Sequence, residues 1–172
     1  MNVYEILTLR LIHIFSGVFW AGSTIYLAAF VMPAINALGA EGGKFMQQLS
    51  RTNKLPLWMN IAALLNVITG FRLLQIMSGN FQSEWLMSNH GLAISFGSLM
   101  ALGGFIIGLV STRPAAMKMA KISEDLAKAG GPPSAEQAKE LESLKNKMGR
   151  TTKAIAWHLA TAVVMMSVAR YI

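Results

Sequence analysis

Apolar residues of this chain come in four long blocks, and the segments between the blocks carry most of the charge. The blocks cover residues 4–32, 55–78, 86–112 and 152–171. A helix needs roughly 20 apolar residues to cross the ~30 Å hydrocarbon core of a bilayer. The pattern therefore predicts an all-α integral membrane protein, in which residues 1–172 form one domain built as a four-helix bundle.

The segment between the third and fourth blocks, at about 113–151, predicts a helical hairpin. Residues 115–129 have a helical composition, and Gly-Gly-Pro-Pro at 130–133 is typical of a turn. Ser134 followed by Gln137 resembles a capping box that begins a second helix. We expect the hairpin to extend the third and fourth membrane helices, with a kink at Pro114. It either stiffens the bundle or binds a partner subunit.

The distribution of Lys and Arg predicts the orientation. Only 13% of the residues are charged, and 53% are hydrophobic. Basic residues lie at 44, 51 and 54, and nine more lie in 113–153, whereas residues 1–9 and 79–89 have none. Basic residues concentrate on cytoplasmic flanks. We expect a multi-pass protein of a bacterial cytoplasmic (inner) membrane, with both termini outside and the hairpin in the cytoplasm. Contact with the anionic headgroups of the lipid bilayer explains the net charge of +7, so no nucleic acid partner is expected.

One histidine lies within the first apolar block. His13, Ser16, Gly17, Trp20 and Thr24 share a helical face, because steps of three and four residues return to the same side. Polar groups at membrane depth usually line a site. His13 offers an iron ligand, Gly17 would let a flat group approach, and Trp20 would form an aromatic wall. This face predicts a haem pocket between helices. The alternative is a hydrogen-bonded structural histidine.

Depth along the predicted helices groups further polar residues with His13. At 1.5 Å per residue, Arg10 lies roughly 6 Å, Arg72 roughly 7 Å and His13 roughly 10 Å below the outer surface. His90 begins the third helix at a comparable depth, whereas His158 lies near the inner side. Haem b fits this distribution, with its propionates beside Arg10 and Arg72. Alternatively, the arginines extend to the interface.

The same depth scale, 1.5 Å per residue, also predicts the second iron ligand. Two nitrogens that hold one iron are only about 4 Å apart, given metal–nitrogen bonds near 2 Å. His13 and His90 differ in depth by roughly 5 Å, and His13 and His158 by about 12 Å. We therefore expect His13 and His90 to be the metal ligands. His158 would be structural or would bind a second haem, and His90 has the alternative of simply beginning a helix at the surface.

A family resemblance begins at the same residues. His13 with Trp20 and Gly22, followed by an apolar run to Met32-Pro33, resembles the opening helix of the copper resistance protein D family. It is also similar to related small membrane proteins that include the HemJ-type protoporphyrinogen oxidase. The closing Ala169-Arg170-Tyr171-Ile172 is similar to four-helix members of that group. The resemblance to the HemJ-type proteins implies a haem-binding role for His13 only.

Three functions remain open from the sequence. The first is a b-type haem protein in electron transfer, with a quinone or other redox subunits as partners. The second is a copper-handling permease, as the copper-resistance resemblance implies. Copper(I) favours thiolate and thioether ligands, but the chain has no Cys and its 12 Met are scattered. The third is a structural or assembly subunit without a cofactor.

Other motifs indicate packing rather than chemistry. No paired carboxylate, nucleophile elbow or phosphate loop can be assembled, so the catalytic residues are unknown. Asn66 and Thr69 are expected to form hydrogen bonds between helices. Gly104 and Gly108 form a GxxxG step, which permits a close helix contact or a homo-oligomer.

Overall fold

The four apolar blocks all form long helices in the computed structural model, which describes residues 2–172. Helices long and apolar enough to cross a membrane run over Val3–Leu38, Leu55–Met77, Asn89–Ala129 and Ala135–Tyr171. No strand occurs among the described residues. The predicted all-α class and the four candidate spans are therefore confirmed.

The first and third helices continue through a proline. The first comprises α1 (Val3–Tyr26), η1 (Leu27–Val31) and α2 (Met32–Leu38), and the third comprises α6 (Asn89–Ile107), η3 (Gly108–Thr112) and α7 (Arg113–Ala129). η1 and η3 are π-helical turns, and Pro33 and Pro114 are each the second residue of the helical segment that follows. Proline lacks the N–H that would continue the α-helical ladder. The wider turn therefore precedes Pro33 and Pro114, and the helix runs on beyond each proline.

The segment after α2, which lies between the first two apolar blocks of the sequence, is helical. It contains α3 (Ala40–Gln47) and η2 (Gln48–Thr52), which lead into α4 (Leu55–Met77). Gly39 has φ +57°, a left-handed conformation that glycine adopts without steric cost. A Cβ at Gly42 would overlap the carbonyl group of Ile35. These two glycines allow α3 to fold back closely against α2.

The remaining elements are α5 (Ser83–Leu86), α8 (Ala135–Val168) and η4 (Ala169–Tyr171). The predicted capping box at the start of α8 is confirmed. The Gln137 N–H donates to Ser134 Oγ at 3.2 Å, and the Ser134 N–H donates to Gln137 Oε1 at 3.0 Å. α7 packs against α8, and Lys118 forms an ion pair with Glu140 between them.

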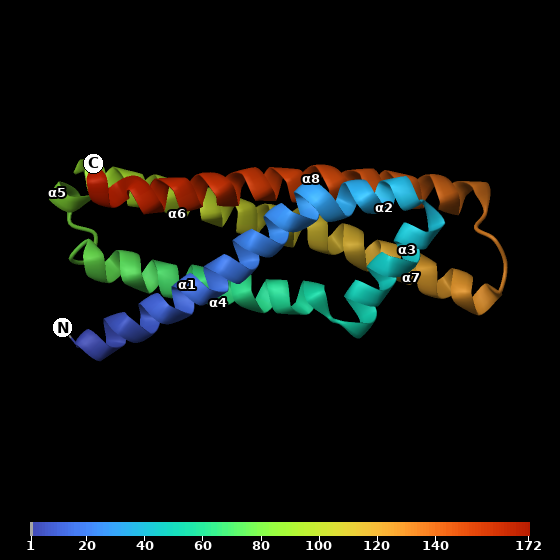
Figure 1. The fold of residues 1–172 in the computed structure, drawn as a ribbon, viewed down its shortest axis with the longest axis horizontal. Helices are drawn as coiled ribbons and strands as arrows, with labels where there is room; N and C mark the ends of the chain where they lie inside the picture. The colour runs from blue at the N-terminus through green and yellow to red at the C-terminus, as the bar shows by residue number, and fades with distance from the viewer. Residues whose placement is uncertain (1) are drawn as a thin grey trace.

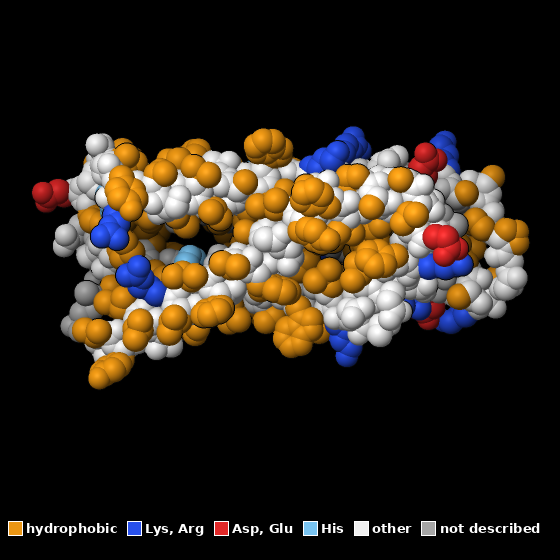
Figure 2. Space-filling view, viewed as in Figure 1, with side chains coloured by type: hydrophobic (Ala, Val, Ile, Leu, Met, Phe, Trp, Pro, Cys, Tyr) orange, Lys and Arg blue, Asp and Glu red, His pale blue; other side chains and the backbone are white. Residues whose placement is uncertain are grey.

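The long helices associate as two pairs, α1 with α4 and α6 with α8 (Figure 1). α1 crosses the bundle obliquely and also contacts α8. Both termini lie at one end, and the turn between α7 and α8 lies at the other. Most charged side chains in this view gather over the end with α3 and α7 (Figure 2). We call the end with the termini the terminal end and the opposite end the hairpin end.

Small side chains form much of the core. The buried cluster contains Trp20, Ala21, Ala62, Ala63, Ile155 and Leu159. Large apolar side chains point outward instead, as Phe15 (73% exposed) and Trp157 (75% exposed) illustrate. This distribution is typical of membrane bundles, in which small residues let helices approach closely. Gly104 of the GxxxG step faces α8, where a Cβ would lie in ordinary contact, 3.4 Å from His158 Cβ and 3.5 Å from Ile155 Cγ2. The helix contact that this glycine makes lies within the chain.

Candidate functional site

The side chains of His13 and Asn66 each form a hydrogen bond with the main chain of the other residue's helix. The His13 ring Nδ1 lies 3.0 Å from the main-chain carbonyl oxygen of Asn66, and Asn66 Nδ2 donates to the main-chain carbonyl of His13 at 2.8 Å. One bond therefore holds each side chain to the opposite backbone, across α1 and α4. Asn66 is buried, with 8% of its surface exposed. We call this reciprocal pair the His13–Asn66 clasp.

The clasp fixes the tautomer of His13. A carbonyl oxygen only accepts hydrogen bonds, so the Nδ1 of the neutral imidazole carries the proton. Thr69 Oγ1 also lies 3.3 Å from Nδ1, and its own hydrogen is donated to the Leu65 carbonyl at 2.6 Å. The Nε2 atom keeps its lone pair and has no hydrogen-bond partner within residues 2–172. This is how a metal-binding histidine is held, with its other nitrogen anchored by a carbonyl.

Two glycines make room for the clasp. A Cβ at Gly17 would lie 2.7 Å from Asn66 Nδ2, and a Cβ at Gly70 would lie 2.8 Å from His13 Cε1. Both distances are well below an ordinary van der Waals contact. Gly17, predicted to let a flat group approach, admits the Asn66 amide. Gly70 admits the imidazole ring, a role that the sequence analysis did not identify.

Trp20, which was expected to form an aromatic wall of the site, lies in the buried core between the helices. It is 6% exposed and packs in the cluster with Ile155 and Leu159 of α8. Its ring meets that of Phe105 on α6 edge to face, with centroids 6.3 Å apart. Trp20 therefore connects α1 to the α6–α8 pair and supplies a reference level for comparing depths across the bundle.

His90 lies at the terminal end of the bundle. Its Nδ1 is 2.8 Å from the carbonyl oxygen of Ala169, and its ring packs edge-on against Trp85 at 5.7 Å between centroids. It follows the first residue of α6, where Ser88 caps the helix. As in His13, the carbonyl partner places the proton on Nδ1 and leaves Nε2 as an acceptor.

His158 lies deeper, in the seam between α8 and α6. Its Nδ1 is 2.9 Å from the carbonyl oxygen of Ala154, one turn earlier in α8. A Cβ at Gly103 would lie 3.0 Å from His158 Cδ2, so this glycine admits the ring. All three histidines are partly buried and anchored through Nδ1 to a main-chain carbonyl.

The depth of each histidine along the bundle can be counted in residues from the level of Trp20. This count changes the differences in depth between His13 and His90 and between His13 and His158. His158 lies at the level of Trp20, because its neighbour Leu159 packs in the cluster with that ring. His13 lies seven residues, about 10 Å, toward the terminal end, and His90 lies fifteen residues, about 22 Å, beyond Phe105. His13 is thus about 12 Å from His90 and about 10 Å from His158 along the bundle. The depths expected from the sequence were counted from separate helix ends, whereas these are counted from residues that pack together, and on this count neither His90 nor His158 is favoured as the second ligand.

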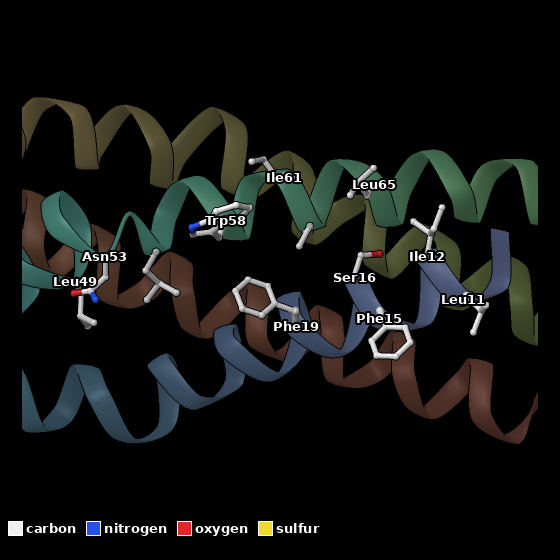
Figure 3. A pocket seen from close by; sticks show the side chains of 12 residues that line it. Leu11, Ile12, Phe15, Ser16, Phe19, Leu49, Asn53, Trp58, Ile61 and Leu65 are labelled. Atoms are coloured by element: carbon white, nitrogen blue, oxygen red, sulfur yellow. The ribbon is translucent and has the colours of Figure 1, made fainter. Parts of the chain in front are cut away.

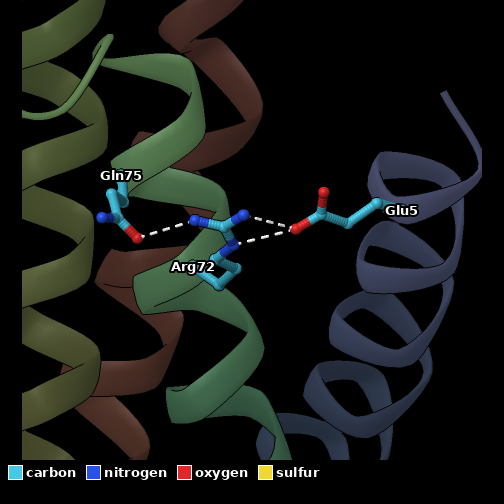
Figure 4. A network of polar contacts seen from close by, with 3 residues as sticks. All are labelled: Glu5, Arg72 and Gln75. Carbon is cyan, nitrogen blue, oxygen red and sulfur yellow. Dashed lines mark hydrogen bonds and ion pairs between the residues drawn. The ribbon is translucent and has the colours of Figure 1, made fainter. Parts of the chain in front are cut away.

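The two arginines differ in their surroundings. Arg72 donates to Glu5 Oε1 through Nε at 2.9 Å and through Nη2 at 2.6 Å, and its Nη1 donates to Gln75 Oε1 at 3.0 Å (Figure 4). Glu5 thus neutralises Arg72 at the terminal end of the α1–α4 seam. Arg10, one turn from His13 on α1, is exposed and has no ion-pair partner within residues 2–172.

The space-filling view is hollowed between α1 and the α6–α8 pair, in the half that carries the termini (Figure 2). A histidine side chain lies at the edge of this hollow. No group of three or more His, Cys, Asp or Glu side chains is placed to hold a metal ion in the described part of the chain. A haem iron, by contrast, takes only its axial ligands from the protein. Each of the three anchored histidines presents one imidazole nitrogen that could serve as such a ligand.

Comparisons with known proteins do not narrow the assignment. No family model, curated protein or solved structure matches this chain.

Proposed function

We propose that this protein is a membrane-embedded b-type haem protein that takes part in electron transfer. The observation that carries the proposal is the state of His13. Its Nδ1–H is held by the Asn66 carbonyl and by Thr69, and its Nε2 has no hydrogen-bond partner among the described residues, in a helix that we place in the membrane. A polar atom without a partner is costly there, and a neutral imidazole nitrogen is a common axial ligand of haem iron.

The residues around His13 have defined roles in this proposal. The clasp sets the direction of the imidazole, and Gly70 gives the ring its place against α4. Arg10, one turn away, has a guanidinium without an ion-pair partner among the described residues, and this group is suited to a propionate. Arg72 would first have to leave Glu5, so Arg10 is the better partner. When bound, haem supplies an iron that takes up and releases one electron.

The proposed setting follows from the charge distribution. We place the protein in the bacterial cytoplasmic membrane, with the terminal end outside and the hairpin end in the cytoplasm. In this proposal the electron partner is a quinone or another redox subunit.

Histidine variants of the full chain test the proposal. The protein is produced in cells supplied with haem, and absorption and electron paramagnetic resonance spectra are recorded for His13→Ala, His90→Ala and His158→Ala. We expect His13→Ala to lose the haem or its low-spin signal while the protein still inserts. Between the other two variants, the one that loses the low-spin signal identifies the second ligand. Asn60→Ala is the matched control, since Asn60 is exposed on α4 and forms no side-chain hydrogen bond in the described structure.

An unaltered spectrum in His13→Ala would remove His13 from the site. Loss of the signal in His158→Ala but not in His90→Ala would identify His158 as the second ligand, contrary to the pairing of His13 with His90 expected from the sequence. Copper without a chromophore in the purified protein would favour the permease instead.

A further inference from the structure

A groove runs along the seam between α1 and α4, from η2 toward the terminal end (Figure 3). Its volume is about 730 Å³, within the range of sites that bind small molecules. Phe15 and Phe19 of α1 line one side, and Ile61 and Leu65 of α4 line the other. The lining is almost wholly apolar, so the groove suits a hydrocarbon chain.

Apart from Ser16, whose hydroxyl donates to the His13 carbonyl, the polar residues of the lining lie near the hairpin end. Asn53 lies at that end, and Trp58 lies further along the groove. The indole nitrogen of Trp58 is directed toward Asn53 (Figure 3). Neither the Asn53 amide nor the Trp58 indole N–H has a hydrogen-bond partner among the described residues. Indole rings commonly lie at the headgroup level of a bilayer. These donors suit the acceptor oxygens of a ligand whose remainder is apolar.

Two cations that have no ion-pair partner in the described part of the chain lie beside the polar end. Arg51 and Lys54 flank Asn53 in the chain, and both are exposed. The ion pairs of residues 2–172 involve Lys44, Lys118, Lys128 and Arg72, and include neither of them. Lys44, on α3, is neutralised by Glu41 at 2.7 Å. The end of the groove thus combines positive charge with free hydrogen-bond donors.

We propose that this groove binds an anionic phospholipid, with one acyl chain between α1 and α4. Its ester carbonyls accept hydrogen bonds from Trp58 and Asn53, and its phosphate lies near Arg51 and Lys54. An anionic lipid satisfies the chain-shaped cavity, the donors and the charges together. A quinone would fill the cavity and use the donors, but its neutral head would leave both cations without a partner. The proposal does not depend on haem binding.

Native mass spectrometry of the purified full-length protein tests the site. Phosphatidylglycerol and phosphatidylcholine with the same acyl chains are titrated separately. Each surface cation contributes about fivefold to the affinity for an anionic lipid, so Arg51→Gln with Lys54→Gln should weaken phosphatidylglycerol binding about 25-fold. Phosphatidylcholine binding should change little. Lys44→Gln is the matched control, because Lys44 lies in the same segment but is paired with Glu41.

A second pair of variants tests the groove without changing charge. Ile61→Trp should fill the groove and reduce the binding of phosphatidylglycerol, whereas Leu64→Trp, on an exposed part of α4 outside the lining, should not. Equal binding of the two lipids by the wild-type protein would overturn the proposal. So would unchanged binding in the double variant or in Ile61→Trp, or the retention of a quinone in place of the phospholipid.

Discussion

Replacing Gly70 with alanine should loosen the His13–Asn66 clasp. The new Cβ would lie 2.8 Å from His13 Cε1 and 3.2 Å from Nδ1. An ordinary van der Waals contact needs roughly half an ångström more, so the ring must move away from α4. That movement lengthens the bonds from Nδ1 to the Asn66 carbonyl, now 3.0 Å, and to Thr69 Oγ1, now 3.3 Å.

The expected decrease in the free energy of unfolding has two contributions. Overpacking costs about 1–3 kcal/mol, and an interhelical hydrogen bond in a membrane protein contributes about 0.6 kcal/mol on average. Alanine offsets part of this, because it favours a helix by about 1 kcal/mol over glycine. Gly22→Ala is the matched control, since a Cβ at Gly22 meets nothing within 4 Å and only the helix term changes. Gly70→Ala should therefore be about 2–3 kcal/mol less stable than Gly22→Ala.

The assay is equilibrium unfolding in mixed micelles, with an anionic detergent as denaturant and the helical circular dichroism signal as the readout. The free energies of unfolding of the two variants are compared under the same conditions. If they agree within about 0.5 kcal/mol, the smallest effect that the hydrogen-bond term alone would give, the ring of His13 does not pack on Gly70 and the clasp is wrongly described.

Three further predictions concern the seam and the orientation. Asn66→Leu should lower the free energy of unfolding by about 1 kcal/mol, because it removes the bond to the His13 carbonyl, whereas Asn60→Leu should not; equal effects in the same unfolding assay would contradict the clasp. Glu5→Gln should cost less than about 1 kcal/mol, since its ion pair is solvent-accessible, and a larger loss in that assay would show that the pair is shielded from solvent. Because the chain has no cysteine, single replacements can be labelled cleanly: in intact cells an impermeant thiol reagent should label Asn80→Cys and not Glu140→Cys, and the reverse pattern would invert the orientation.

The membrane helices were predictable because length and hydropathy alone define them. The second span, predicted at 55–78, is α4 (Leu55–Met77). The capping box at Ser134 was also readable, since it depends on residues three apart. The helices α2 and α3 were not predicted, because their residues have no long apolar block and their close packing depends on Gly39 and Gly42.

The site was predictable only in part. His13 was recognised from its place in an apolar block, and Asn66 was expected to bond between helices, as it does. The role of Gly70 depends on the register of α1 against α4, which no local pattern specifies. The partner of Arg72 was missed because Glu5 lies 67 residues away, although Glu5 is the only acidic residue of its apolar block.

The reduced-minus-oxidised absorption spectrum of the purified wild-type protein tests the central claim most directly. The protein is produced in cells supplied with haem and purified as the full chain. A b-type haem held by His13 predicts a Soret band that shifts on reduction, together with a resolved α-band, in a preparation with haem bound to most chains. A folded, monodisperse protein that shows no Soret band after purification and after addition of haem would contradict the claim.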